Sequence, residues 1–270
     1  MTTGMDFMAA VVEKKRARLR DAQAGASFYN LRASAYEFRS SASRHALRKA
    51  LSNDAQINVI AEIKRASPSR GDLGLSATVA ETAGAYAQGG AVAVSVLTEE
   101  DYFGGSLRDL RAVRRAVALP VLRKDFIFDD YQVYEAAAAG ANALLLIVAL
   151  LDDETLMRLR TIAETELGMD ALVEVHTREE MMRASASGAS LIGVNNRNLH
   201  TFEVSIDVSL DLRQAAPADA VLVSESGLSN GAELKLLREV GYHGFLIGEA
   251  LVASKDPESA LREMIQEAEK

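Results

Sequence analysis

The chain has 270 residues, 49% of them hydrophobic and 25% charged, which is typical of a globular protein with one large domain or two small ones. Its net charge of −8 argues against a general nucleic-acid binder, and its lack of cysteine excludes disulfides, thiol nucleophiles and cysteine-ligated metals. An anionic substrate is still compatible with this charge, because such a substrate responds to the local field of a cleft.

We expect a cytoplasmic protein without a membrane partner. A chain without cysteine fits a reducing compartment. The first ten residues lack the basic and apolar segments of a secretion signal. The longest apolar run, at 143–151, has nine residues, which is too short to span a bilayer.

Residues 1–52 predict an N-terminal helical extension that packs on the rest of the chain. Apolar residues recur at roughly helical spacing from Met5 to Leu19, and a second helical stretch contains Leu47 and Leu51. The basic residues of 14–20 are interpreted as a solvated face of the first helix.

From residue 58 onward, short apolar runs alternate with helical segments about every 25 residues. The predicted strands are Val59–Ile63, Ala91–Leu97, Pro120–Leu122, Ala143–Val148, Ala171–Val175, Leu191–Val194, Ala220–Val223 and Phe245–Ile247. The predicted helices are Thr78–Gln88, Leu107–Val117, Tyr131–Ala139, Glu154–Glu166, Arg178–Ala186, Ser209–Ala215, Gly231–Val240 and Pro257–Glu267. Four of these helices end near a glycine, the usual residue at that position: Gly90, Gly140, Gly188 and Gly241.

Eight strand–helix units in residues 53–270 predict a (β/α)8 TIM barrel, which forms one catalytic domain overall with its N-terminal helical extension. A doubly wound sheet is the alternative. It rarely needs eight evenly spaced units, and no Gly-x-Gly-x-x-Gly sequence opens the first helix.

The end of the first predicted strand is unusual for a core strand. Glu62 and Lys64 stand two residues apart, so both side chains point to the same face. Burying two opposite charges is costly unless they are paired or take part in chemistry. Because TIM barrels carry their active sites at the C-terminal ends of the strands, this pair marks a candidate site.

Six other predicted strands also end in polar residues, whereas the strand at 143–148 ends only in apolar ones. The charged and amide side chains expected to converge on one mouth are Glu62, Lys64, Lys124, Glu174, Asn195, Arg197 and Glu225. A cluster of this kind shifts pKa values and supplies acid and base groups. The pattern therefore predicts an enzyme.

Glycines and small residues after the last two strands suggest a phosphate site. Ser226 and Gly227 follow the seventh strand, and Gly248 and Glu249 follow the eighth, where barrels often bind phosphate through backbone N–H groups. Ordinary turn glycines are the alternative interpretation.

Two phenylalanines near the predicted mouth, Phe103 and Phe126, would suit a flat apolar group, with ordinary core packing as the alternative. The four histidines show no metal-ligand spacing, so we expect no metal.

Several stretches resemble the indole-3-glycerol phosphate synthase family, over roughly residues 55–252. They are Ala61-Glu62-Ile63-Lys64-Arg65-Ala66-Ser67-Pro68-Ser69, Leu97-Thr98-Glu99 with Tyr102-Phe103-Gly104-Gly105-Ser106, Leu122-Arg123-Lys124-Asp125-Phe126, Glu174-Val175-His176, Gly193-Val194-Asn195-Asn196-Arg197-Asn198-Leu199 and Ser224-Glu225-Ser226-Gly227. The resemblance implies ring closure of 1-(2-carboxyphenylamino)-1-deoxyribulose 5-phosphate to indole-3-glycerol phosphate, with loss of carbon dioxide and water, in tryptophan biosynthesis. It also implies a carbon–carbon lyase that uses no cofactor.

The resemblance further implies the roles of the catalytic residues. Lys124 would be the general acid that protonates the ketone oxygen, and Glu174 the base or charge partner in the later dehydration. Lys64 would bind the substrate carboxylate and share in the dehydration. Glu62, Asn195 and Glu225 would position the lysines and the substrate hydroxyls.

The same resemblance implies the substrate-binding residues. Arg197 would bind near the carboxylate end of the substrate, and Phe103 and Phe126 would flank its aromatic ring. The residues expected around the phosphate are Ser67, Ser226, Gly227, Gly248 and Glu249. The loop 69–75 would form a mobile lid, and the N-terminal extension would pack over the mouth.

Two other functions remain open at this point. Another phosphate-binding barrel isomerase, such as phosphoribosylanthranilate isomerase, would use a catalytic cysteine, which this chain lacks. A non-catalytic barrel that binds phosphorylated metabolites would not need Lys124 or Glu174, and both are present. We expect a monomer that binds a small phosphorylated molecule and at most associates weakly with other tryptophan-pathway enzymes.

Overall fold

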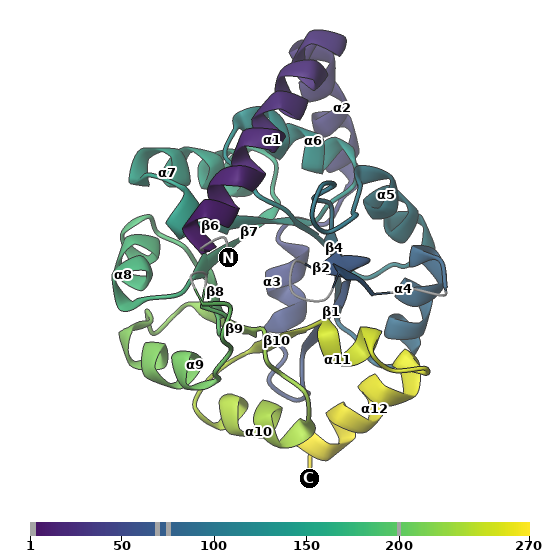
Figure 1. Cartoon of the computed structure of the whole chain (residues 1–270), viewed down its shortest axis with the longest axis vertical. Helices are drawn as coiled ribbons and strands as arrows, with labels where there is room; N and C mark the ends of the chain where they lie inside the picture. The colour runs from purple at the N-terminus through teal and green to yellow at the C-terminus, as the bar shows by residue number, and fades with distance from the viewer. Residues whose placement is uncertain (1–3, 68–70, 74–76, 199–200) are drawn as a thin grey trace.

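The structure is a computed structural model that describes residues 4–67, 71–73, 77–198 and 201–270. In this part of the chain, eight parallel strands close into a barrel in which neighbours along the chain are also neighbours in space (Figure 1). The strands are β1 (Val59–Ile63), β4 (Ala93–Leu97), β5 (Val121–Lys124), β6 (Ala143–Ile147), β7 (Asp170–Val175), β8 (Leu191–Asn195), β9 (Val221–Glu225) and β10 (Gly244–Ile247). The predicted TIM barrel is confirmed.

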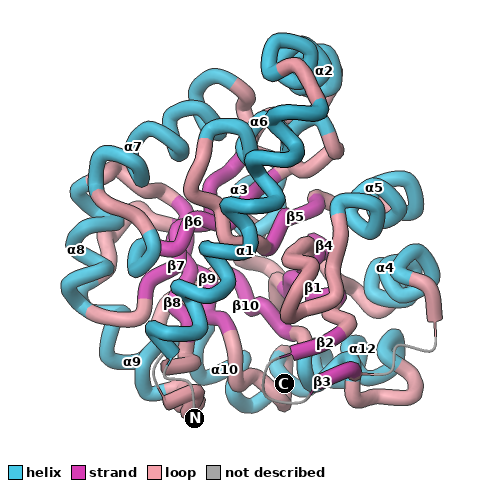
Figure 2. Tube along the Cα trace, turned by 45° about the horizontal axis from the view of Figure 1, so that its top comes forward, coloured by secondary structure: helices cyan, strands magenta, loops and turns pink. Residues whose placement is uncertain are grey.

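Helices surround the barrel (Figure 2). They are α4 (Val79–Gln88), α5 (Leu107–Ala116), α6 (Asp130–Ala138), α7 (Asp153–Thr161), α8 (Arg178–Ala186), α9 (Asp207–Leu212), α10 (Gly231–Glu239), α11 (Glu249–Val252) and α12 (Pro257–Ala268). Side chains cap many helix N-termini; Thr78 and Asp129, for example, each form a capping box. The four predicted helix-ending glycines all have positive φ angles. Among the described residues, no helix combines the length and apolar character needed to cross a membrane.

Three strands run further than their apolar runs predicted. β5 includes Lys124, β8 includes Asn195 and β9 includes Glu225. The parallel ladder continues through these residues, pairing Lys124 with Leu97 and Asn195 with Glu225. A predicted strand that stops at the first polar residue is therefore too short here, because backbone pairing does not depend on the polarity of the side chain.

Alternation along the strands explains why polar groups end up at one end of the barrel interior. Ile60, Leu122 and Leu172 belong to the apolar cluster inside the barrel. Two residues further along each strand stand Glu62, Lys124 and Glu174, on the same face. The barrel interior is thus apolar toward the N-terminal ends of the strands and charged at their C-terminal ends.

From residue 4 onward, three helices precede the barrel, whereas the sequence pattern indicated only the first and the third. They are α1 (Gly4–Gly25), α2 (Phe28–Ser41) and α3 (Ala46–Leu51). α2 was not identified because its aromatic residues are largely exposed, as Tyr29 is at 80%, and so give no clear apolar stripe. The division into residues 1–52 and 53–270 stays a prediction.

The short helix α3 closes the N-terminal end of the barrel, and Figure 1 shows it in the middle of the strand ring. Leu47 and Leu51 are fully buried in the interior apolar cluster. The Asp170 carboxylate accepts the backbone N–H groups of Leu47 and Arg48 at 2.9 and 3.1 Å, which satisfies the start of the helix.

The interpretation of residues 14–20 as a solvated basic face is wrong for Lys15. This side chain is buried, and its Nζ lies 2.6 Å from Oδ1 of Asp125, the residue after β5. Arg123 pairs with the other oxygen of the same carboxylate at 3.0 Å. Burying the Asp125 carboxylate is costly unless cations pair with it. The ion pair with Asp125 therefore stabilises Lys15 in its buried position.

Candidate active site

A cavity of about 390 Å³ lies at the C-terminal ends of the barrel strands. The predicted site residues that line it are Glu62, Lys64, Phe103, Lys124, Phe126, Glu174, Asn195, Arg197, Glu225, Ser226, Gly227, Gly248 and Glu249. The backbone of Ser67 pairs with Gly71 in a short antiparallel sheet, β2 (Ala66–Ser67) and β3 (Gly71–Asp72), while the Ser67 side chain lies outside what the structure describes. Most of the predicted lid 69–75 also lies outside the described residues.

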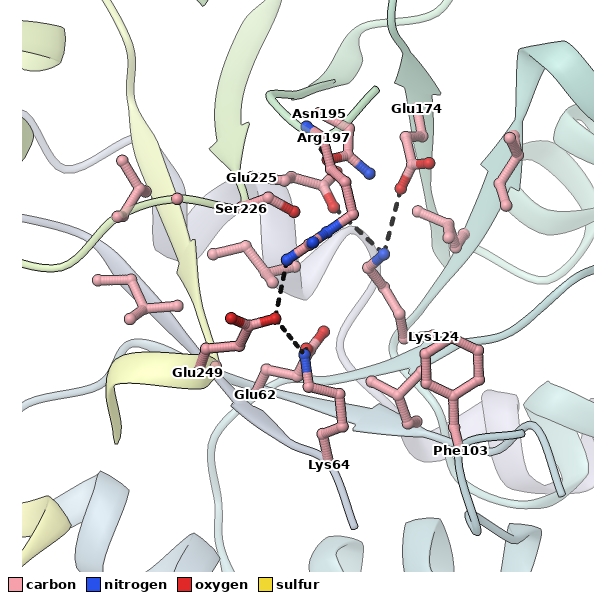
Figure 3. Close-up of a pocket in the computed structure, with 18 of the residues that line it drawn as sticks. Glu62, Lys64, Phe103, Lys124, Glu174, Asn195, Arg197, Glu225, Ser226 and Glu249 are labelled. Carbon is pink, nitrogen blue, oxygen red and sulfur yellow. Dashed lines mark hydrogen bonds and ion pairs between the residues drawn. The ribbon is translucent and has the colours of Figure 1, made fainter. Parts of the chain in front are cut away.

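Lys124 projects from the end of β5 between two carboxylates (Figure 3). Its Nζ lies 3.1 Å from Glu174 Oε2 and 3.3 Å from Glu225 Oε2. Burial by itself would lower the pKa of Lys124, but the negative charges of the surrounding glutamates outweigh it and raise the pKa above its ordinary value. Lys124 is therefore a cation that carries a proton at neutral pH.

The two carboxylates beside Lys124 differ in their proton affinity. Burial would raise the pKa of Glu174, but Lys124 and His176 overcome this effect and lower the pKa. Burial is the largest effect at Glu225 and raises its pKa. The neighbouring carboxylates raise it further and Lys124 lowers it, so that the pKa is about 8. Glu174 is thus ionised at neutral pH while Glu225 holds a proton, an arrangement that separates base from acid.

A second charged group occupies the opposite side of the cavity (Figure 3). Lys64 Nζ lies 3.4 Å from Glu62 Oε1 and 3.8 Å from Glu249 Oε1. Arg197 Nη2 donates to the same Glu249 oxygen at 2.8 Å. One carboxylate therefore lies between two cations that the sequence places 133 residues apart, and an anionic substrate group could use the same pair.

Two glycines in the barrel wall make room for the site carboxylates. A Cβ at Gly193 of β8 would lie 2.0 Å from Glu225 Oε1, and one at Gly248 would lie 2.8 Å from Glu62 Oε1. Gly193 was not a predicted site residue. Its role depends on the neighbouring strand, so no local sequence signal could have identified it.

The turn after β9 adopts an uncommon backbone conformation. Ser226 and Gly227 have φ angles of 67° and 78°. Positive φ is unfavourable for serine, and such positions cluster at functional sites. Asn196, which the sequence analysis missed, holds the turn by donating from Nδ2 to the Ser226 carbonyl at 3.0 Å.

Aromatic rings form another wall of the cavity. The ring centroids of Phe103 and Phe126 lie 6.3 Å apart. Phe7 of α1 packs against Phe103 and Phe202, with centroid distances of 6.5 and 6.0 Å. Phe7, Met8 and Phe202 line the cavity but were not predicted as site residues, because only the tertiary fold brings α1 to the mouth.

The described part of the chain contains no evident set of metal ligands. No group of three or more histidine, aspartate or glutamate residues there could hold a metal ion. The expectation that the reaction needs no metal stays a prediction.

Comparisons with known proteins agree with one another. A family model described as indole-3-glycerol phosphate synthase matches residues 8–264. The chain is 48% identical to an indole-3-glycerol phosphate synthase of Carboxydothermus hydrogenoformans, over 96% of this chain and 99% of that protein. It is 54% identical to one of Mycolicibacterium gilvum, over 77% and 76% of the two chains.

A solved structure supports the fold alone. The 3-hexulose-6-phosphate synthase of Salmonella typhimurium superposes with a TM-score of 0.63 at 16% identity, covering 78% of this chain and 98% of that one. Such low identity is informative about the barrel and carries no argument about the reaction.

Proposed function

The chain belongs to the indole-3-glycerol phosphate synthase family, and from this premise we propose that the cavity around Lys124 is the site where its substrate closes into an indole. The protein is a decarboxylating lyase of tryptophan biosynthesis. It converts 1-(2-carboxyphenylamino)-1-deoxyribulose 5-phosphate into indole-3-glycerol phosphate, carbon dioxide and water. The observation that carries the assignment of the site is the buried Lys124 ammonium between two carboxylates at the cavity wall.

Substrate binding uses both ends of the molecule. The substrate carboxylate would meet Lys64 and Arg197, whose cationic groups face one another across Glu249. The phosphate would lie against the turns of Ser226–Gly227 and Gly248, which line the cavity and have positive φ angles at Ser226 and Gly227; backbone N–H groups of such turns are a usual donor set for anions. Anchoring both ends folds the flexible chain so that ring and ketone approach each other.

Ring closure requires a proton donor at the ketone oxygen. The aromatic carbon that bears the carboxylate attacks the ketone carbon, and Lys124 donates a proton to the oxygen as its carbonyl double bond opens. Carbon dioxide then leaves, and the electrons of the broken bond restore the aromatic ring. The fixed ammonium of Lys124 also stabilises negative charge that develops on the oxygen.

Dehydration completes the indole. The new hydroxyl leaves as water after taking a proton from an acid, for which Lys64 or the recharged Lys124 is the donor. The carbon next to the nitrogen loses a proton to Glu174, whose lowered pKa keeps it ionised. Glu62 of β1, Asn195 of β8 and Glu225 of β9 orient these groups.

The direct test is to mix the purified protein with the substrate without added metal and to follow indole fluorescence. We expect the signal to rise with time and with enzyme concentration. No fluorescence, with the protein folded and the substrate intact, would contradict the proposed function.

We further propose that the protein works as a monomer in the cytoplasm. The lack of cysteine supports a reducing compartment. Light scattering at micromolar concentration tests the first point, and a dimer mass would contradict it. Cell fractionation tests the second.

A further inference from the structure

His176 is a buried titratable group next to the site that the proposed steps do not use. It follows β7 directly, and its side chain is 8% exposed. It does not belong to the residues that line the cavity. Within the described structure, its Nε2 atom is buried and has no hydrogen-bond partner. A buried polar nitrogen without a partner needs an explanation.

The imidazole lies between two carboxylates, one at each nitrogen. Nε2 is 3.4 Å from Glu174 Oε1, and Nδ1 is 3.2 Å from Glu180 Oε2. Glu180, in the first turn of α8, is itself held in place, because the same Oε2 accepts the backbone N–H of His176 at 2.7 Å. A neutral imidazole would direct a lone pair at one of these carboxylates, whereas an imidazolium offers a proton to each.

Glu174 is consequently held by His176 and Lys124, and a hydrogen bond with the Asn195 side chain adds to them. Its Oε1 faces His176, and its Oε2 accepts a hydrogen bond from Lys124 at 3.1 Å. The carboxyl groups that act on the imidazole are Glu174 of its own strand, Glu180 of α8 and Glu225 of β9, and Lys124 of β5 acts through Glu174. Of these, Glu225 holds its proton at neutral pH and adds its negative charge only as pH rises toward about 8.

We propose that His176 is a positioning residue which, as an imidazolium, fixes the orientation of the Glu174 carboxylate and keeps it ionised for proton abstraction. This inference rests on the proposed role of Glu174. Burial opposes the charged form, but the facing carboxylates outweigh it and raise the pKa of His176. The cation in turn lowers the proton affinity of Glu174, which keeps the base available at neutral pH.

The protonation state can be measured on the wild-type enzyme by ¹⁵N NMR of the histidine side chains, without a turnover assay. We expect the titration to show a His176 pKa above the ordinary value of about 6.5, with both ring nitrogens protonated below it. His243 serves as an internal comparison, because burial lowers its pKa. A His176 pKa at or below 6.5 would overturn the proposal.

The kinetic test compares His176→Gln with the wild type across pH. Without the cation, Glu174 binds its proton more tightly, so the acid limb of the kcat profile should move up by about one pH unit. The value of kcat at neutral pH should fall by about tenfold, less than the loss of a catalytic acid or base, and KM should change little.

A uniform fall in kcat with an unmoved limb would identify a structural role and overturn the proposal. If His176→Gln does not fold, the NMR titration is repeated on Glu180→Gln, which should lower the His176 pKa, and an unchanged pKa there would count equally against it. Full activity of Glu174→Gln would instead refute the proposed role of Glu174, while the imidazole titration would still report its own result.

Discussion

Lys124 combines burial with two carboxylate contacts, at 3.1 and 3.3 Å from its Nζ. This placement supports the proposed role of Lys124 as the acid at the ketone oxygen, and no other lysine of the described cavity has the same two partners. Lys64 lies on the other side, with Glu62 and Glu249, which suits it to hold the substrate carboxylate.

Replacing Lys124 by alanine should lower kcat by roughly 10²- to 10⁴-fold, because a positioned general acid contributes about that much. The proposed anchors for phosphate and carboxylate remain in this variant, so the dissociation constant of the substrate should rise only a few-fold. An equilibrium binding titration with the inactive variant measures it. Lys235→Ala, an exposed lysine on α10, is the matched control. Turnover near the wild-type rate would rule out Lys124 as the acid.

Glu225 gives the site a pH dependence of stability. Its pKa is raised to about 8 by burial and neighbouring carboxylates, so between its unfolded pKa and 8 the folded state holds a proton that the unfolded state has lost. Stability therefore falls as pH rises through this window, by about 1.4 kcal/mol per pH unit from this group alone.

Glu225→Gln removes that titration. The free energy of unfolding of the variant, measured in urea, should increase relative to the wild type as pH rises from 6 to 8, and the difference should level off above the folded pKa of about 8. The same comparison below pH 4, where both states are protonated, should show no further change with pH. A constant difference from pH 6 to 9 would contradict the raised pKa.

At the scale of elements, α1 reaches the active site through two kinds of contact. Phe7 lies in the aromatic wall of the cavity, and Lys15 binds Asp125 next to the proposed acid Lys124. The helix thus covers the mouth and also holds the end of β5. Arg18 adds an exposed pair with Asp101 at 2.8 Å, which contributes little by itself.

Lys15→Met should destabilise the protein because it leaves a buried carboxylate with one cation fewer. We expect a loss below about 3–5 kcal/mol, the usual cost of breaking a buried pair, since Arg123 still compensates Asp125. Arg20→Met on the exposed face of the same helix should change stability by less than about 0.5 kcal/mol. Equal effects of the two changes in thermal melts would show that Lys15 carries no structural charge pair.

At the scale of the whole molecule, the extension meets both ends of the barrel. α1 covers the C-terminal end with the active site, while α3 closes the N-terminal end with Leu47 and Leu51. Between them, α2 packs along α6, and Arg39 donates to the carbonyl oxygens of Leu167 and Gly168, both at 2.9 Å. The three helices therefore have separable effects on binding and on folding.

Two truncations should separate these effects. Removing residues 1–25 takes away α1, so the barrel should still fold, with a raised KM and lower thermal stability. Removing residues 1–52 also exposes the apolar interior beneath Leu47 and Leu51, and this protein should not fold. Circular dichroism measures folding and stability, and KM measures binding. Wild-type stability of the chain that lacks residues 1–52 would contradict the closing role of α3.

Much of this architecture could be predicted from the residues alone. The eight apolar runs and their helical partners repeat locally, and the repeat predicts the barrel. Alternation along a strand then places Glu62 and Lys64 on one face, and the same rule applies to Lys124, Glu174 and Glu225. The residues quoted as a family resemblance indicated the reaction itself, and the comparisons confirmed it.

Contacts between parts of the chain that are far apart in sequence determine which residues complete the site. The sequence pattern predicts a solvent-exposed Lys15. In the structure, Lys15 is buried because it pairs with Asp125, which lies 110 residues away in the sequence. No local periodicity marks Phe7 or Gly193 as site residues. The two ring nitrogens of His176 contact carboxylates from different elements, Glu174 of β7 and Glu180 of α8. Local periodicity and strand alternation are properties of neighbouring residues, so a sequence carries them directly. Pairings across the barrel depend on the closure of the strands in space, and their energies arise only once burial removes water from both partners.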